Sequence, residues 1–173
     1  CLVGSEMCIR DRYASHNGVY RMSPAIEGLV ETSNNIAKIS IANATLKIEC
    51  LTRSSVDSSK DDMAATLRSV FELAGYTVQC SGHYPGWAPN MDSAILKVVE
   101  SLYISLHGEK PNVAACHAGL ECGILGQNYP KMDMISFGPT IKGAHSPDER
   151  ASISSAQKYW KFVLEILKNI PLK

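Results

Sequence analysis

Apolar and polar residues alternate between residues 30 and 54, a pattern typical of half-buried β-strands. The alternation covers residues 39–41, stops at 43–44 and returns over residues 46–50. We therefore predict that this region forms a hairpin of two strands, each with one apolar face.

The segment after the hairpin changes to the spacing of an α-helix. Its apolar residues recur three and four positions apart: Met63, Leu67, Val70, Phe71 and Ala74. Ser58 or Ser59 can cap the start of this helix, and Gly75 supplies its end. Residues 76–80 resume a strand pattern, so the region up to about residue 83 is predicted to be a ββαβ unit.

A stretch rich in glycine and proline, residues 81–93, is the best candidate for a domain boundary. Beyond it, helical patterns alternate with short apolar runs, which favours a parallel α/β layer. The expected helices and strands are 93–106 (helix), 112–116 (strand), 120–126 (helix), 132–137 (strand) and 154–169 (helix). The last helix is expected to bury Ala156, Trp160, Val163, Leu164 and Leu167.

Composition excludes several classes of protein. The chain has 173 residues, of which 45% are hydrophobic, and its 17 Lys and Arg balance 17 Asp and Glu. A balanced charge gives no field to attract nucleic acid, and the apolar runs are far shorter than the ~20 residues of a membrane helix. Six scattered cysteines without a CxxC pair favour reduced thiols and a cytoplasmic location.

The first twelve residues show neither helical nor strand periodicity and look like a translated sequencing adapter. We assign residues 1–12 no fold, and the start at Cys1 leads us to expect a truncated reading frame. The domains predicted for the remainder are residues 13–83 and 84–173.

Three places contain residues suited to chemistry. In the first, His117, Gly119 and Glu121 lie at the predicted join of a strand and a helix, where α/β sheets bind ligands. The alternative is that His117 and Glu121 cap the helix or pair with each other. The second place is His145 in a loop rich in glycine and proline, where an imidazole suits zinc. A plain surface histidine is the alternative there.

The third place is Arg53 at the end of the hairpin, because a guanidinium can bind a carboxylate through two parallel hydrogen bonds. A solvated arginine at a strand end is the alternative. The chain contains no HExxH, no HxD pair and no paired glutamates, so a complete metal site is not evident from its motifs. A GxSxG motif is also missing, and nothing orders Cys116 or Cys122 as a nucleophile.

Long motifs in these same places resemble the C-terminal part of the dipeptidases of the M20 metallopeptidase family. They are RSSVDSS from Arg53, YPGW from Tyr84, HAGLECG from His117, YPKMDMISFGPT from Tyr129 and HSPDE from His145. The similarity extends from about residue 16 to residue 173, in the same order throughout.

The resemblance implies an α/β fold: the second half of an α+β (ββαβ) lid domain, followed by the C-terminal part of a zinc peptidase catalytic domain. It implies two Zn²⁺ ions, with other divalent ions possible, and hydrolysis of dipeptides, Xaa-His among them, by metal-activated water. His145 matches a metal ligand, and Arg53 and Gly119 match substrate-binding residues. The general base and the other metal ligands would lie upstream, so we expect these 173 residues alone to be inactive.

The resemblance further implies a homodimer of the intact protein, formed through the lid, with neither nucleic acid nor membrane as a partner. Two alternatives stay open: another M20 amidohydrolase, such as an aminoacylase or carboxypeptidase, and a non-catalytic interaction module built on the lid. A hydrolase that uses Cys116 or Cys122 ranks behind both.

Overall fold

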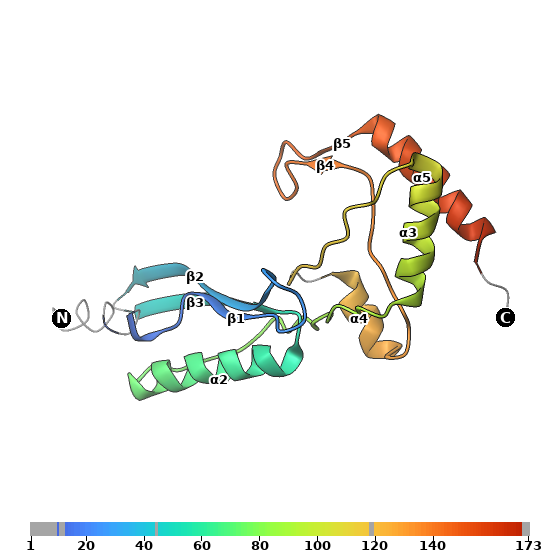
Figure 1. The fold of residues 1–173 in the computed structure, drawn as a ribbon. Coiled ribbons are helices and arrows are strands. Elements are labelled where there is room, and N and C mark those ends of the chain that lie inside the picture. Colours follow the sequence, from blue (N-terminus) through green and yellow to red (C-terminus); the bar gives the residue numbers. More distant parts are fainter. Residues whose placement is uncertain (1–9, 11–12, 44, 118–119, 171–173) are drawn as a thin grey trace. The chain divides into compact units, whose positions relative to one another are not determined.

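The computed structural model describes residues 10, 13–43, 45–117 and 120–170, shown as the coloured ribbon in Figure 1. The chain forms two compact units. The first combines Cys1–Pro89 with Ala114–Pro130, and the second combines Asn90–Val113 with Lys131–Lys173. Of residues 1–12, which we assigned no fold, all but Arg10 lie outside the described part of the chain.

A three-stranded antiparallel sheet is the frame of the first unit. Its order is β1 (Gly18–Met22), β2 (Val30–Ala42) and β3 (Thr45–Ser54). The predicted hairpin is confirmed as β2 and β3, whose last pair is Ala42 with Thr45. Asn43 has a φ of 50°, the left-handed conformation that a two-residue hairpin turn requires and that asparagine tolerates. The short strand β1 was not predicted.

Helix α2 (Asp57–Leu73) covers one face of this sheet and forms the core of the unit (Figure 1). Met63, Leu67 and Phe71 are buried, as predicted from their spacing, and pack against Tyr20 and Ile48. The prediction that Ser58 or Ser59 caps the helix is wrong, because the N-cap residue is Val56, which makes no side-chain cap bond.

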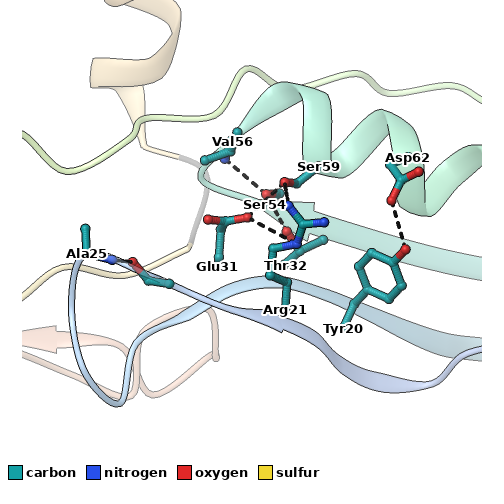
Figure 2. Close-up of polar contacts among 10 residues, drawn as sticks. Tyr20, Arg21, Ala25, Glu31, Thr32, Ser54, Val56, Ser59 and Asp62 are labelled. Atoms are coloured by element: carbon teal, nitrogen blue, oxygen red, sulfur yellow. Dashed lines mark hydrogen bonds and ion pairs between the residues drawn. The ribbon is translucent and has the colours of Figure 1, made fainter.

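Ser59 belongs to a polar cluster between α2 and the strands, shown in Figure 2. Its hydroxyl donates to Oε1 of the buried Glu31 at 2.8 Å, and Nε of Arg21 lies 4.0 Å from the same oxygen. Thr32 and Ser54, on adjacent strands, are hydrogen-bonded at 2.8 Å. Buried polar groups that are paired in this way fix the helix against the strands, and so fix the end of β3.

The predicted strand at residues 76–80 is wrong. These residues, all described, are not part of a β-ladder, although Tyr76 and Val78 pack against the core under α2. The apolar alternation therefore indicated burial correctly. It could not indicate hydrogen bonding to a neighbouring strand, because that depends on a free sheet edge being within reach.

The second unit contains α3 (Ala94–His107), α5 (Ile153–Lys168) and a short antiparallel pair, β4 (Ile141–Lys142) with β5 (Arg150–Ala151). Both helices were predicted, and α3 begins at the N-cap Ser93, whose side chain accepts from the backbone of Leu96. Val99 and Phe162 are buried, and Tyr103 and Phe137 contact the Phe162 ring edge to face. The third predicted helix, α4 (Glu121–Asn128), lies in the first unit.

The predicted parallel layer is absent from the described residues, in which both sheets are antiparallel. Residues 112–116 and 132–137, expected to be strands, are not paired with any described strand. In α5 the predicted burial is also partly wrong: Trp160 is 60% and Leu167 59% exposed, and Leu164 is exposed as well, while Ala156 and Val163 are half-buried. Phe162 takes the buried position, because α5 packs on α3 through that side.

Across the part of the chain that the structure describes, no helix is both long enough and apolar enough to cross a bilayer.

Candidate functional site

Arg53 lies near the end of β3, on the face of the sheet opposite α2, which we call the open face. Ile48, five positions earlier, packs against the core under α2, and side chains of a strand alternate between its two faces. Arg53 therefore points away from α2, and it is exposed. Ser33 of β2 is its direct partner in the register, so the two side chains share that face as neighbours.

His117 completes a cluster on the same face. Its Nε2 lies 3.0 Å from the hydroxyl oxygen of Ser33, a hydrogen bond between residues 84 positions apart. Burial lowers the pKa of His117 below its ordinary value, and the positive charge of Arg53 lowers it further. Both effects favour the neutral form of the imidazole. We call Arg53, Ser33 and His117 the Arg53 cluster.

A pocket of about 280 Å³ opens beside this cluster. It is lined by Asn17, Gly18, Val19, Val30, Ser33, Asn34, Asn35 and His117. Several of its walls are rigid, because Asn17 accepts a hydrogen bond from the backbone of Ile36, and Asn34 bonds to the carbonyl of His16 and the hydroxyl of Thr52. The pocket can therefore hold a small group next to a fixed positive charge.

The YPGW segment follows α2 in the sequence and contacts both the end of the hairpin, at Ser55, and α4, at Gly123. The amide of Gly86 donates to Oδ1 of Asp57 at 2.9 Å, and Lys60 binds both Asp57 and the carbonyl of Tyr84. The lysine and the Gly86 amide together lower the pKa of Asp57 despite its partial burial, which alone would raise it. Gly86 and Gly123 both lie directly against other backbone. A Cβ added at Gly86 would lie 2.4 Å from the Ser55 carbonyl oxygen, and one added at Gly123 would lie 2.6 Å from the Pro85 carbonyl oxygen. These contacts tie α4 to the end of the strand that carries Arg53.

The other residues of the HAGLECG motif have less definite roles. Gly119 lies outside the described residues. Neither His117 nor Glu121 caps α4, whose N-cap residue is Leu120 without a side-chain cap bond. Glu121 is the acidic residue of the first turn of α4, where the helix dipole favours a carboxylate. Burial and Glu121 raise the pKa of the Cys122 thiol, which disfavours a thiolate nucleophile.

His145 lies in the second unit, in the loop that joins β4 to β5. Its φ of 64° is left-handed, which is uncommon for a residue with a side chain. Several hydrogen bonds hold the loop, among them His145 N–H to Glu149 Oε2 at 2.9 Å, Ser146 Oγ to the Gly143 carbonyl at 2.7 Å, and Glu149 N–H to the Ser146 carbonyl at 3.1 Å. Glu149 thus binds the backbone of His145. The imidazole is exposed on a restrained turn.

Metal ligands are not gathered in the described residues. No group of three or more His, Cys, Asp or Glu side chains there is arranged to hold an ion. An imidazole such as that of His145 fits zinc chemically, but it supplies one donor where a catalytic zinc site takes three from the protein. A metal centre that includes His145 would need donors from outside this part of the chain.

Comparison with known proteins gives the class of this chain: it belongs to peptidase family M20/M25/M40, whose model matches residues 7–169. Members of this family are typically metal-dependent. The resemblance inferred from the motifs is thereby confirmed.

Two dipeptidases are similar to it in particular. The cytosol non-specific dipeptidase of Escherichia coli (strain K12) is 44% identical over 165 residues, which are 95% of this chain and 34% of that protein. The crystal structure of aminoacylhistidine dipeptidase from Vibrio alginolyticus matches with a TM-score of 0.84 and 44% identity, covering 98% of this chain and 34% of that one. The chain therefore spans about a third of the length of these relatives. It is a mixed α/β part of the M20 peptidase fold.

The sequence indicated Arg53 and His117 as separate candidates, and the structure brings them together. Ser33, which joins them, was not singled out, because nothing in its local sequence distinguishes it from the many other serines of the chain. The strand register places Ser33 beside Arg53, and the hydrogen bond places it beside His117.

Proposed function

We propose that these residues are part of a zinc-dependent dipeptidase that hydrolyses dipeptides, Xaa-His among them. One observation of the structure supports this most: the open face of the sheet presents Arg53 with Ser33 and His117 beside a pocket. A guanidinium in such a place suits the free carboxylate of a short peptide. The similarity to two dipeptidases supports the same substrate class.

In this proposal Arg53 binds the substrate carboxylate, and Gly119 is a second substrate-binding residue, as the resemblance to the family implies. His145 is one ligand of a two-zinc centre, and its left-handed backbone supports a functional role, because strained residues tend to occur at binding sites. Bound zinc would polarise the scissile carbonyl and activate a water molecule. The remaining ligands and the general base would come from the two thirds of the relatives that this chain does not span.

Three further parts of the proposal concern the whole protein. Residues 13–83 belong to a lid and dimerisation domain, and residues 84–173 to the end of the catalytic domain. The intact protein is a homodimer in the cytoplasm, a location that the name of the E. coli relative supports. Without the other ligands, the 173-residue chain alone does not catalyse hydrolysis.

A chimera tests the proposal. We would replace the aligned third of the E. coli dipeptidase with this chain and assay release of amino acids from Ala-His and Ala-Ala with Zn²⁺. The expected result is hydrolysis by the chimera, its loss on chelation, and no hydrolysis by the 173-residue chain. Loss of about 10²-fold or more in kcat/KM is expected for His145→Ala.

Two controls make this result specific. N-acetyl-alanine and a tetrapeptide test for the aminoacylase and carboxypeptidase alternatives within the family. A chimera that folds and dimerises but cleaves none of the dipeptides would refute the proposed function, as would a His145→Ala chimera with unchanged turnover.

A further inference from the structure

The pocket beside the Arg53 cluster has walls of mixed character. Ser33, Asn35 and His117 supply polar groups, and Val19 and Val30 supply apolar surface. His117 comes from a different part of the chain than the strands that form the other walls. His117 thus supplies a part of the lining that the sheet alone does not.

The position of this pocket relative to Arg53 is fixed by two contacts. Ser33 lines the pocket and is the direct cross-strand neighbour of Arg53. His117 lines it too, is bonded to Ser33 at 3.0 Å, and is close enough to Arg53 to be influenced by its charge. Arg53 itself does not line the pocket, but its neighbours Ser33 and His117 do, so a group bound to the guanidinium lies next to residues that line the pocket.

We propose that this pocket receives the side chain of the residue whose free carboxylate binds Arg53, and that His117 determines which side chains fit. The inference rests on the proposed function and deepens it, because it assigns specificity for the carboxyl-terminal residue of the peptide to His117 and Ser33. Two carboxylate oxygens pair with the guanidinium, and the side chain on the adjacent carbon enters between His117 and the strands.

The simpler role for His117 is to dock residues 114–130 onto the sheet through Ser33. That role is structural, and its loss would change stability without changing the order in which peptides are preferred. A specificity role predicts a changed order of preference, so measurements with several peptides separate the two.

The first experiment uses the 173-residue chain and NMR of its histidine rings and arginine Nε groups. Ala-Gly, Ala-Ala and Ala-Trp are titrated in, together with Ala-Ala amide, which lacks the carboxylate. We expect Ala-Ala to shift the Arg53 and His117 signals with one saturation curve, and the amide to leave both unchanged.

His117→Ala is the decisive variant. Removal of the imidazole should weaken Ala-Ala binding about tenfold, the usual effect of losing one favourable contact of this kind. It should also raise the affinity for Ala-Trp relative to Ala-Ala about tenfold, because the pocket becomes larger. Ser33→Ala should weaken binding without favouring Ala-Trp. His83→Ala, at an exposed histidine of the same unit, is the matched control and should change neither.

The inference would be overturned by Arg53 signals that respond to peptides while those of His117 do not, or by a His117→Ala chain with the wild-type order of affinities. Absence of any response from either residue at 100 mM peptide would overturn it as well.

The same variant in the dipeptidase chimera separates this inference from the proposed function. KM for Ala-Ala should rise about tenfold with kcat within about twofold, because the pocket binds substrate and transition state alike. If the chimera cleaves dipeptides and His117→Ala leaves its KM and selectivity unchanged, the specificity role of the pocket is refuted while the proposed function stands. A chimera that cleaves none refutes the proposed function.

Discussion

Among the described glycines of the first unit, Gly86 is the one at which an added methyl group should cause the largest disturbance. A Cβ built there lies 2.4 Å from the Ser55 carbonyl oxygen and 2.6 Å from its carbon, both of which are backbone atoms. Backbone cannot rotate away as a side chain can. Gly86→Ala must therefore move the YPGW segment away from the end of β3.

The free-energy cost follows from two terms. To reach 3.0 Å, below which real Cβ atoms essentially never approach, the segment must move about 0.6 Å. Overpacking of this kind costs about 1–3 kcal/mol. The shift also weakens the hydrogen bond from the Gly86 amide to Asp57, worth about 1 kcal/mol at a carboxylate that is 45% exposed. Reduced entropy of the unfolded chain offsets about 0.4–1 kcal/mol, so we expect a net loss of about 1–4 kcal/mol.

Urea unfolding followed by the fluorescence of Trp87, the next residue, measures this loss where it occurs. The second tryptophan, Trp160, is exposed in the other unit and is replaced by Phe in all variants. Gly138→Ala is the matched control, because Gly138 has an ordinary φ and no atom within 4 Å of an added Cβ.

Gly138→Ala should leave the free energy of unfolding within about 0.5 kcal/mol of the parent or slightly raise it. Equal stability of Gly86→Ala and Gly138→Ala would refute the reasoning. It would mean that the YPGW segment does not contact Ser55 as closely as the structure shows.

Two other predictions concern the core and the Arg53 cluster. Met63→Ala should cost about 2–5 kcal/mol by urea unfolding, whereas Leu73→Ala on the same helix, 90% exposed, should stay within about 0.5 kcal/mol; similar losses would contradict the assigned core. Arg53→Gln should raise the pKa of His117 toward its ordinary 6.5 in an NMR titration, since burial and the arginine both lower it. Because the folded state holds the His117 proton less tightly than the unfolded state, stability should fall as pH drops below 6.5, and less so in Arg53→Gln.

Local periodicity was enough to predict the parts of the fold that are stabilised locally. The β2–β3 hairpin and the helices α2, α3, α4 and α5 all appear close to their predicted positions. The buried side of α2 was also predicted, because its apolar spacing has one sheet to pack against.

Features that depend on a distant partner were not predictable in this way. Residues 112–116 have the composition of a buried strand, but a strand exists only where another edge accepts its hydrogen bonds. Trp160 matches the helical spacing of a core residue, yet the side of α5 that packs on α3 carries Phe162 instead.

The Arg53 cluster shows the same limit at the level of the site. Ser33 and Arg53 are neighbours because of the register between β2 and β3, which contains an irregularity between Ile36 and Lys38. A shift of β2 by one residue would turn the side chain of Ser33 to the other face of the sheet. Chemistry-bearing residue types were visible in the sequence, but their grouping was not.

In the proposed function, the division of the chain into two units separates substrate binding from hydrolysis. Arg53, Ser33, His117 and the pocket all belong to the first unit, whereas His145 belongs to the second. A carboxylate site of this composition needs no metal, because charge and hydrogen bonding supply its affinity. A hydrolytic centre at His145 needs further donors, which the described residues do not gather around it. Peptide binding should therefore be measurable in the chain as it stands, independently of hydrolysis, and this makes the first unit the place to begin testing what the protein recognises.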